Sequence, residues 1–146
     1  MSNFWSKPIL TSILILLLTA CSVATPPTEF APPGEIVENA ILLQLSRTEQ
    51  LLSQQLNVAE PQLEISQIQV KQIEPVYIDD LAAYHLHGIY NLKLTLSRQE
   101  ITQKHNPFDI YLQRQIEGKT WRLLIKELLP EQVPIWKSYL VSPDSF

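Results

Sequence analysis

The chain is poor in cysteine, glycine and positive charge. Its 146 residues include one cysteine and three glycines, and its formal net charge is −4. A single cysteine excludes an internal disulfide, and so few glycines give no glycine-rich phosphate-binding loop. Nucleic-acid-binding proteins need clustered Lys and Arg for phosphate contacts, and this mildly acidic chain offers no such cluster. We therefore expect no nucleic-acid partner.

The chain also lacks a hydrophobic run long enough to span a membrane. The longest apolar stretch, residues 9–18, follows Lys7 and ends before the small pair Thr19-Ala20. About ten residues are too few to cross a hydrocarbon core of ~30 Å. A short apolar run after a positive charge and before small residues is typical of a secretory signal. The alternative is an uncleaved signal anchor followed by an ordinary cysteine.

The run ends in Leu18-Thr19-Ala20-Cys21. This tetrapeptide resembles the lipobox of bacterial lipoprotein precursors. The resemblance implies cleavage between Ala20 and Cys21 and a lipid such as palmitate on Cys21. It implies a protein anchored by lipid to the cell membrane or the outer membrane, with its domain outside the cytoplasm. It implies no particular activity.

The predicted organisation has three parts. Residues 1–20 form the signal peptide, and residues 21–33 form the lipidated cysteine and a tether. The tether is rich in proline (Pro26, Pro27, Pro32 and Pro33), which favours an extended backbone. At ~3.1 Å per residue it would hold the domain ~35 Å from the membrane. Residues 34–146 form a single domain with an irregular C-terminal tail over residues 128–146.

The domain opens with a predicted helix over residues 35–56. Glu35 and Glu38 lie in its first turn, where the helix dipole favours negative charge. Its apolar residues recur at helical spacing and give a stripe that needs a partner surface. The stripe comprises Val37, Ile41, Leu45, Leu52 and Leu56.

Alternating residues then predict four strands. The ranges are about 63–70 with a bulge near Ser66–Gln67, 84–97, a third beginning after the turn signal at 105–107, and 120–127. We interpret residues 76–83 as a connection and Glu117-Gly118 as a two-residue hairpin turn. That turn places Leu112 opposite Leu123, Arg114 opposite Trp121 with a cation–π contact, and Asp109 opposite Lys126. Gly88 falls on the apolar face, where a missing side chain would admit another element closely.

These elements predict an α+β fold. One long N-terminal helix packs on a curved, mainly antiparallel four-stranded sheet, preceded by the signal peptide and the Pro-rich tether. The order of elements resembles the cystatin-like and NTF2-like α+β group. Cystatin inhibition would need a Gln-x-Val-x-Gly loop, and residues 67–71 do not supply one.

Three histidines are the strongest candidates for metal chemistry. His85 and His87 lie two apart on one strand face, but a site needs a third ligand. Only His105, Asp79 and Asp80 offer themselves, and nothing in the spacing brings them close. We therefore expect no metal site, no cofactor and no catalytic set. Asp79-Asp80 is interpreted as a solvated turn.

The sequence thus favours a membrane-anchored envelope lipoprotein that is a non-catalytic accessory or protein-binding module. A possible envelope protein would be its partner. The first alternative is a small-ligand carrier or enzyme with an NTF2-like cavity, which would need an enclosed pocket with convergent polar groups. The second is an oligomeric structural envelope component, which would need an exposed apolar patch around Ile89, Tyr111 and Leu124.

Overall fold

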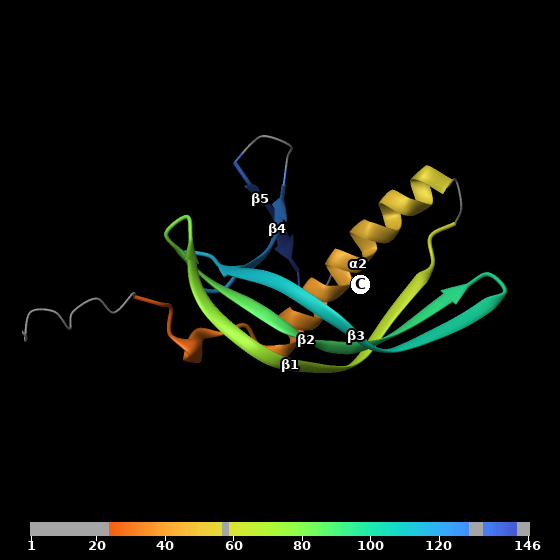
Figure 1. Cartoon of the computed structure of the whole chain (residues 1–146), viewed down its shortest axis with the longest axis horizontal. Coiled ribbons are helices and arrows are strands. Elements are labelled where there is room, and N and C mark those ends of the chain that lie inside the picture. The colour runs from red at the N-terminus through yellow and green to blue at the C-terminus, as the bar shows by residue number, and fades with distance from the viewer. Residues whose placement is uncertain (1–23, 57–58, 129–132, 143–146) are drawn as a thin grey trace, which may run out of the picture.

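The computed structural model describes residues 24–56, 59–128 and 133–142. It contains one 3-10 turn, one long α-helix and five strands (Figure 1). The elements are η1 (Thr28–Phe30), α2 (Gly34–Leu56), β1 (Gln62–Ile78), β2 (Leu81–Leu96), β3 (Gln99–Arg114), β4 (Trp121–Glu127) and β5 (Ile135–Val141).

The strands form one antiparallel sheet in the order β1-β2-β3-β4-β5. The sheet curls, so that β1–β3 lie below α2 in the view of Figure 1 while β4 and β5 rise beside it. The predicted fold class is therefore wrong. The sheet has five strands rather than four, and the helix follows an N-terminal segment that itself packs on the domain.

The missed strand is β5, within the tail that we expected to be irregular. It pairs with β4 from Trp121–Val141 to Glu127–Ile135. Lys137 and Ser138 interrupt the apolar alternation, while the spacing of Trp136, Tyr139 and Leu140 resembles a helical turn. As an edge strand, β5 buries only Val141 fully, so its sequence carries little apolar signal.

The core lies between the first half of α2 and one face of the sheet. Val37, Ala40 and Ile41 pack against apolar residues that alternate along β2, β3 and β4. Tyr84, Leu86, Tyr90, Leu92, Phe108, Ile110, Leu112, Trp121 and Leu123 are the buried partners on those strands. The predicted helix range is confirmed.

At Gly88, a neighbouring strand and an aromatic ring come close to the backbone. A Cβ built on it would lie 2.1 Å from the carbonyl oxygen of Gln69 and 2.6 Å from the ring of Phe108. The predicted need for a missing side chain at Gly88 is confirmed, because both a neighbouring strand and an aromatic ring occupy that space.

The β1–β2 hairpin corrects the predicted connection over residues 76–83. Ile78 pairs with Leu81, which leaves only Asp79 and Asp80 as turn residues. Both have positive φ (50° and 61°), as a type I′ turn requires. Aspartate tolerates this backbone better than most residues, so two acidic residues close a hairpin where we expected a longer loop.

The β2–β3 hairpin corrects the start of the third strand. Leu96 pairs with Gln99, so β3 begins well before the expected turn at residues 105–107. That signal instead marks a bulge: the register shifts between Tyr90 and Leu92, and His105 has φ 57°. A left-handed residue in a strand bends the ladder without reversing the chain.

The β3–β4 hairpin has the predicted register, with Leu112 opposite Leu123 and Arg114 opposite Trp121. The ladder ends at Tyr111–Leu124, so the expected Asp109–Lys126 pair does not form. The guanidinium of Arg114 lies over the ring of Phe30, 4.9 Å from its centroid, instead of over Trp121. The loop is also longer than the expected two residues. The backbone N–H of Gln115 donates to the carbonyl oxygen of Thr120, so the loop between them comprises residues 116–119.

Strand β1, one of the two edge strands of the sheet, is irregular. Its register with β2 shifts between Ser66 and Gln69 and again between Val70 and Gln72. The first shift confirms the predicted bulge. Pro75 removes one further backbone donor, which an edge strand tolerates.

The proline-rich segment packs on the domain. Pro26 is fully buried, and the hydroxyl of Tyr84 donates a hydrogen bond to the carbonyl oxygen of Pro27 over 2.7 Å. Together with Phe30 under Arg114, these contacts fix residues that we expected to form a free tether. In the described parts of the chain, no helix has the length and apolarity needed to cross a membrane.

Candidate functional site

A group of histidine and carboxylate side chains lies on the outer face of the sheet, away from α2. Three neighbouring strands supply it: Glu74 on β1, His85 and His87 on β2, and Asp109 on β3. Glu74 pairs directly with His85, and His87 pairs directly with Asp109. We call these four residues the His–carboxylate cluster. Cross-strand pairing brings all of them to one face.

Distances within the cluster are short. His85 Nε2 lies 2.7 Å from Asp109 Oδ1, and His85 Nδ1 lies 3.6 Å from Glu74 Oε2. His87 Nδ1 lies 3.4 Å from the other oxygen of Asp109. One ligand atom from each of Glu74, His85 and His87 falls within 4.8 Å of the others, and no other such group occurs in the described residues.

Aromatic side chains hold the histidines in place. The Tyr111 ring stacks on His85 with centroids 3.9 Å apart and planes 8° apart. Trp136 of β5 meets Tyr111 edge-on at 4.9 Å. Burial raises the pKa of the Tyr111 phenol, and the negative charges of Asp109 and Glu74 raise it further. The negative charges of Asp109 and Glu74 therefore act on the phenol whose ring stacks on His85.

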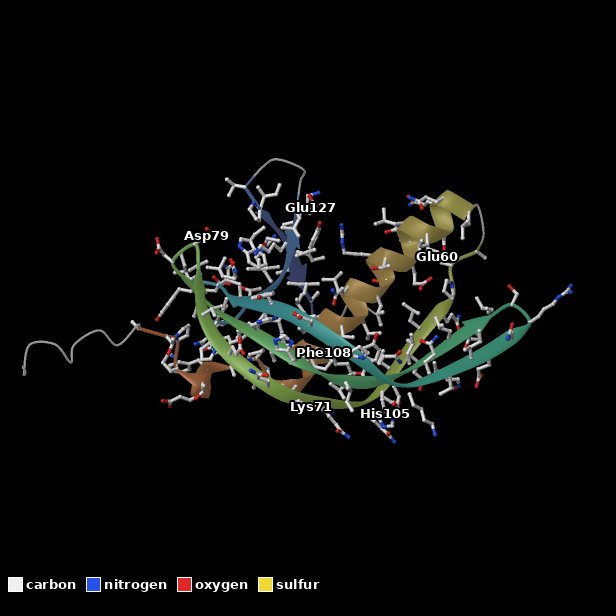
Figure 2. The ribbon with its side chains drawn as sticks, viewed as in Figure 1. Glu60, Lys71, Asp79, His105, Phe108 and Glu127 are labelled. Carbon is white, nitrogen blue, oxygen red and sulfur yellow. The ribbon has the colours of Figure 1, made fainter. Side chains whose placement is uncertain are left out.

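The structure does not assemble the ligand set considered from the sequence. His105 lies in the β3 bulge, where its backbone N–H donates to Asn91 Oδ1, and Asp79 and Asp80 form the β1–β2 turn. Figure 2 shows Asp79 and His105 far apart along the sheet. Glu74 and Asp109 take their place. Their proximity to the histidines follows only from the strand registers. Those registers depend on the β1–β2 and β2–β3 hairpins, and both were predicted at the wrong positions.

A second surface is apolar and lies on the second half of α2. The predicted helix stripe is covered at Val37 and Ile41 but uncovered at its end. Leu51 is 61 % exposed, Leu52 45 % and Leu56 69 %. We call these three residues the apolar helix end. Figure 1 shows this half of the helix rising away from the strands.

The space between helix and sheet is largely filled. One hollow of about 330 Å³ remains between the middle of α2 and β2–β3, open to solvent and lined by Ile41, Leu45, Tyr90 and Phe108 among others. This hollow is open to solvent, unlike the enclosed polar pocket expected of an NTF2-like carrier. The patch expected of a structural oligomer is reduced as well, because Leu124 is buried and Ile89 and Tyr111 are only partly exposed.

The predicted cleavage site, Ala20 and Cys21, and the signal peptide over residues 1–20 lie outside the described residues. Comparison with known proteins adds no assignment: no family model, no curated protein and no solved structure matches this chain.

Proposed function

We propose that the protein is a membrane-anchored envelope lipoprotein whose domain is a non-catalytic module that binds another envelope protein. The observation that carries the binding role is the apolar helix end. A helix whose stripe is buried in one half and bare in the other leaves large leucine side chains in water. Contiguous exposed apolar surface of this kind marks interaction sites in soluble domains.

The packing between helix and sheet supports a surface-binding role over a carrier role. Tyr84, Leu86, Leu112 and Leu123 are almost wholly buried in the core cluster that also contains Val37, Ala40 and Ile41 of α2. A ligand inside the domain would have to displace these side chains, whereas a partner on the apolar helix end displaces only water.

The binding role can be tested by site-specific photo-crosslinking in intact cells. A photoreactive residue at Leu56 should give a discrete protein adduct, and the same residue at the exposed Lys71 on β1 should not. Leu52→Lys should remove the Leu56 adduct, because a charge in the apolar surface opposes burial. Adducts to lipid alone, or equal adducts from both positions, contradict the proposed partner.

The anchoring role rests on the lipobox residues. Wild type should incorporate palmitate and partition into detergent, whereas Cys21→Ala should lose the palmitate label and remain unprocessed. The unprocessed variant keeps its apolar signal, so fractionation needs a second control. Residues 22–146 behind an ordinary secretory signal should be soluble outside the cytoplasm. An unmodified Cys21 in a mature chain that begins at Met1 contradicts the anchor.

A further inference from the structure

We infer that the His–carboxylate cluster binds one zinc-like divalent transition-metal ion through Glu74, His85 and His87. This site is independent of the apolar helix end and of Cys21. The sequence predicted no metal because a third ligand was missing. The strand registers supply that ligand, since Glu74 lies directly opposite His85.

The hydrogen bond of His85 determines which of its nitrogens faces the ion. Asp109 can only accept, so His85 Nε2–H donates to Asp109 Oδ1 over 2.7 Å. In a neutral ring, Nδ1 then carries a lone pair, and it faces Glu74 Oε2 at 3.6 Å. Two lone-pair groups that face each other across this distance repel each other unless a cation, either a proton or a metal ion, lies between them.

Asp109 takes the role of an orienting carboxylate. Metal-binding histidines almost always donate their second ring N–H to a carboxylate or carbonyl, which fixes the tautomer and the ring direction. Asp109 binds His85 in this way and also approaches His87 Nδ1 at 3.4 Å. Stacking on Tyr111 fixes the His85 ring from its face. The site is therefore organised before the ion arrives.

The ligand set selects the class of metal. Two imidazoles and one carboxylate suit zinc and similar borderline ions, while magnesium and calcium prefer oxygen ligands alone. Ligand atoms that lie within 4.8 Å of one another must draw in to about 3.5 Å, the spacing set by tetrahedral bonds of about 2.0–2.2 Å, and side-chain rotation can supply this movement. The side chains of His87 and Asp109 also line an open hollow of about 490 Å³, which leaves a coordination position accessible to water or another ligand.

Calorimetric titration of the full-length protein in detergent tests the site, after chelator treatment and with zinc chloride as the probe. We expect one zinc ion per chain and no binding heat with magnesium chloride. Glu74→Gln and His87→Asn should each abolish stoichiometric binding. Asp109→Asn should keep the stoichiometry and weaken the affinity roughly 10–100-fold, as for other carboxylates that orient a metal-binding histidine.

His105→Asn is the matched control. His105 is an exposed histidine on the same sheet, and asparagine tolerates its positive φ. This variant should bind zinc as wild type does. Cobalt in place of zinc should give the visible absorption of a low-symmetry site in wild type and His105→Asn, and this absorption should be absent in Glu74→Gln and His87→Asn. The proposal would be overturned if wild type bound no zinc, or if both Glu74→Gln and His87→Asn still bound it. It would also be overturned if His105→Asn lost zinc binding to the same extent as those two variants. Since Glu74 is exposed, its variant separates ligand loss from unfolding.

Discussion

The hydroxyl of Tyr84 donates a hydrogen bond to the carbonyl oxygen of Pro27, which lies 57 residues earlier in the chain. Tyr84 is fully buried in the sheet, and Pro27 belongs to the segment that precedes the helix. This bond joins the N-terminal segment to the core of the domain.

We expect Tyr84→Phe to lower the free energy of unfolding by about 1–2 kcal/mol, because Pro27 loses its donor while the ring is kept. Limited proteolysis should then cut the segment before the domain. Phe30→Ala is a useful comparison, since it removes the contact with Arg114 and leaves the Tyr84 bond intact. Wild-type stability and wild-type proteolysis of Tyr84→Phe would contradict the docking of this segment.

Gly88→Ala should be severely destabilising. The added methyl group would meet the backbone oxygen of Gln69 and the ring of Phe108, and the backbone cannot yield easily. We expect a loss of about 3 kcal/mol or more, measured by chemical denaturation. In Gly34→Ala the new methyl group meets nothing within 4 Å. That control should leave stability unchanged or raise it by up to about 1 kcal/mol, since alanine favours the helix. Equal effects of the two substitutions would be inconsistent with the packing at Gly88.

The Asp79-Asp80 turn should gain stability from glycine. Asp80 has φ 61°, which glycine adopts without steric cost. Asp80→Gly should raise the unfolding free energy by about 0.5–1 kcal/mol, and Asp80→Val should lower it by about 1–2 kcal/mol. Thermal unfolding of the pair provides the measurement. A stabilising valine would mean that the hairpin turn differs from the one described.

Alkaline pH should destabilise the domain through its buried tyrosines. Burial raises the pKa of Tyr84 above the ordinary value of 10.0 and does the same for Tyr90. A raised pKa in the folded state means that the stabilising contribution is complete below the unfolded pKa and is lost as pH rises through the folded pKa. Unfolding free energy should therefore be steady from about pH 8 to about pH 9.5 and fall above about pH 10.

The double variant Tyr84→Phe/Tyr90→Phe removes both phenols and should flatten this alkaline decline relative to its own value at neutral pH. Tyr77→Phe is the exposed control and should leave the slope close to that of wild type. A decline that is unchanged in the double variant would assign the alkaline sensitivity to other groups.

Local periodicity predicted the elements that bury one full face. The helix, the inward residues of β2 and the Leu112–Leu123 register all follow from apolar spacing, because burial on one side imposes a period. Edge strand β5 was not predicted, because it buries few side chains and carries Lys137 and Ser138 in its middle. The start of β3 was predicted too late, because the positive φ at His105 gives a bulge and the sequence alone does not distinguish a bulge from a turn there.

The candidate metal site was only half predictable. His85 and His87 share a strand, so their proximity follows from the strand period. Glu74 and Asp109 come from different strands, and their placement depends on the lengths of the turns at Asp79-Asp80 and Ser97-Arg98. If the position of either turn is predicted wrongly, the register shifts and the carboxylate on that strand no longer lies opposite a histidine. The site is then missing from the prediction.

The irregular edge strand β1 has a consequence for the proposed lipid anchoring. Lipid anchoring confines proteins to two dimensions and raises their local concentration, so a long, regular, exposed strand edge would invite pairing between neighbouring copies. Two register shifts and Pro75 interrupt the row of free backbone donors on β1, and Lys71 adds a charge beside them. This edge resists sheet-to-sheet aggregation, and crowded copies of the domain can remain separate.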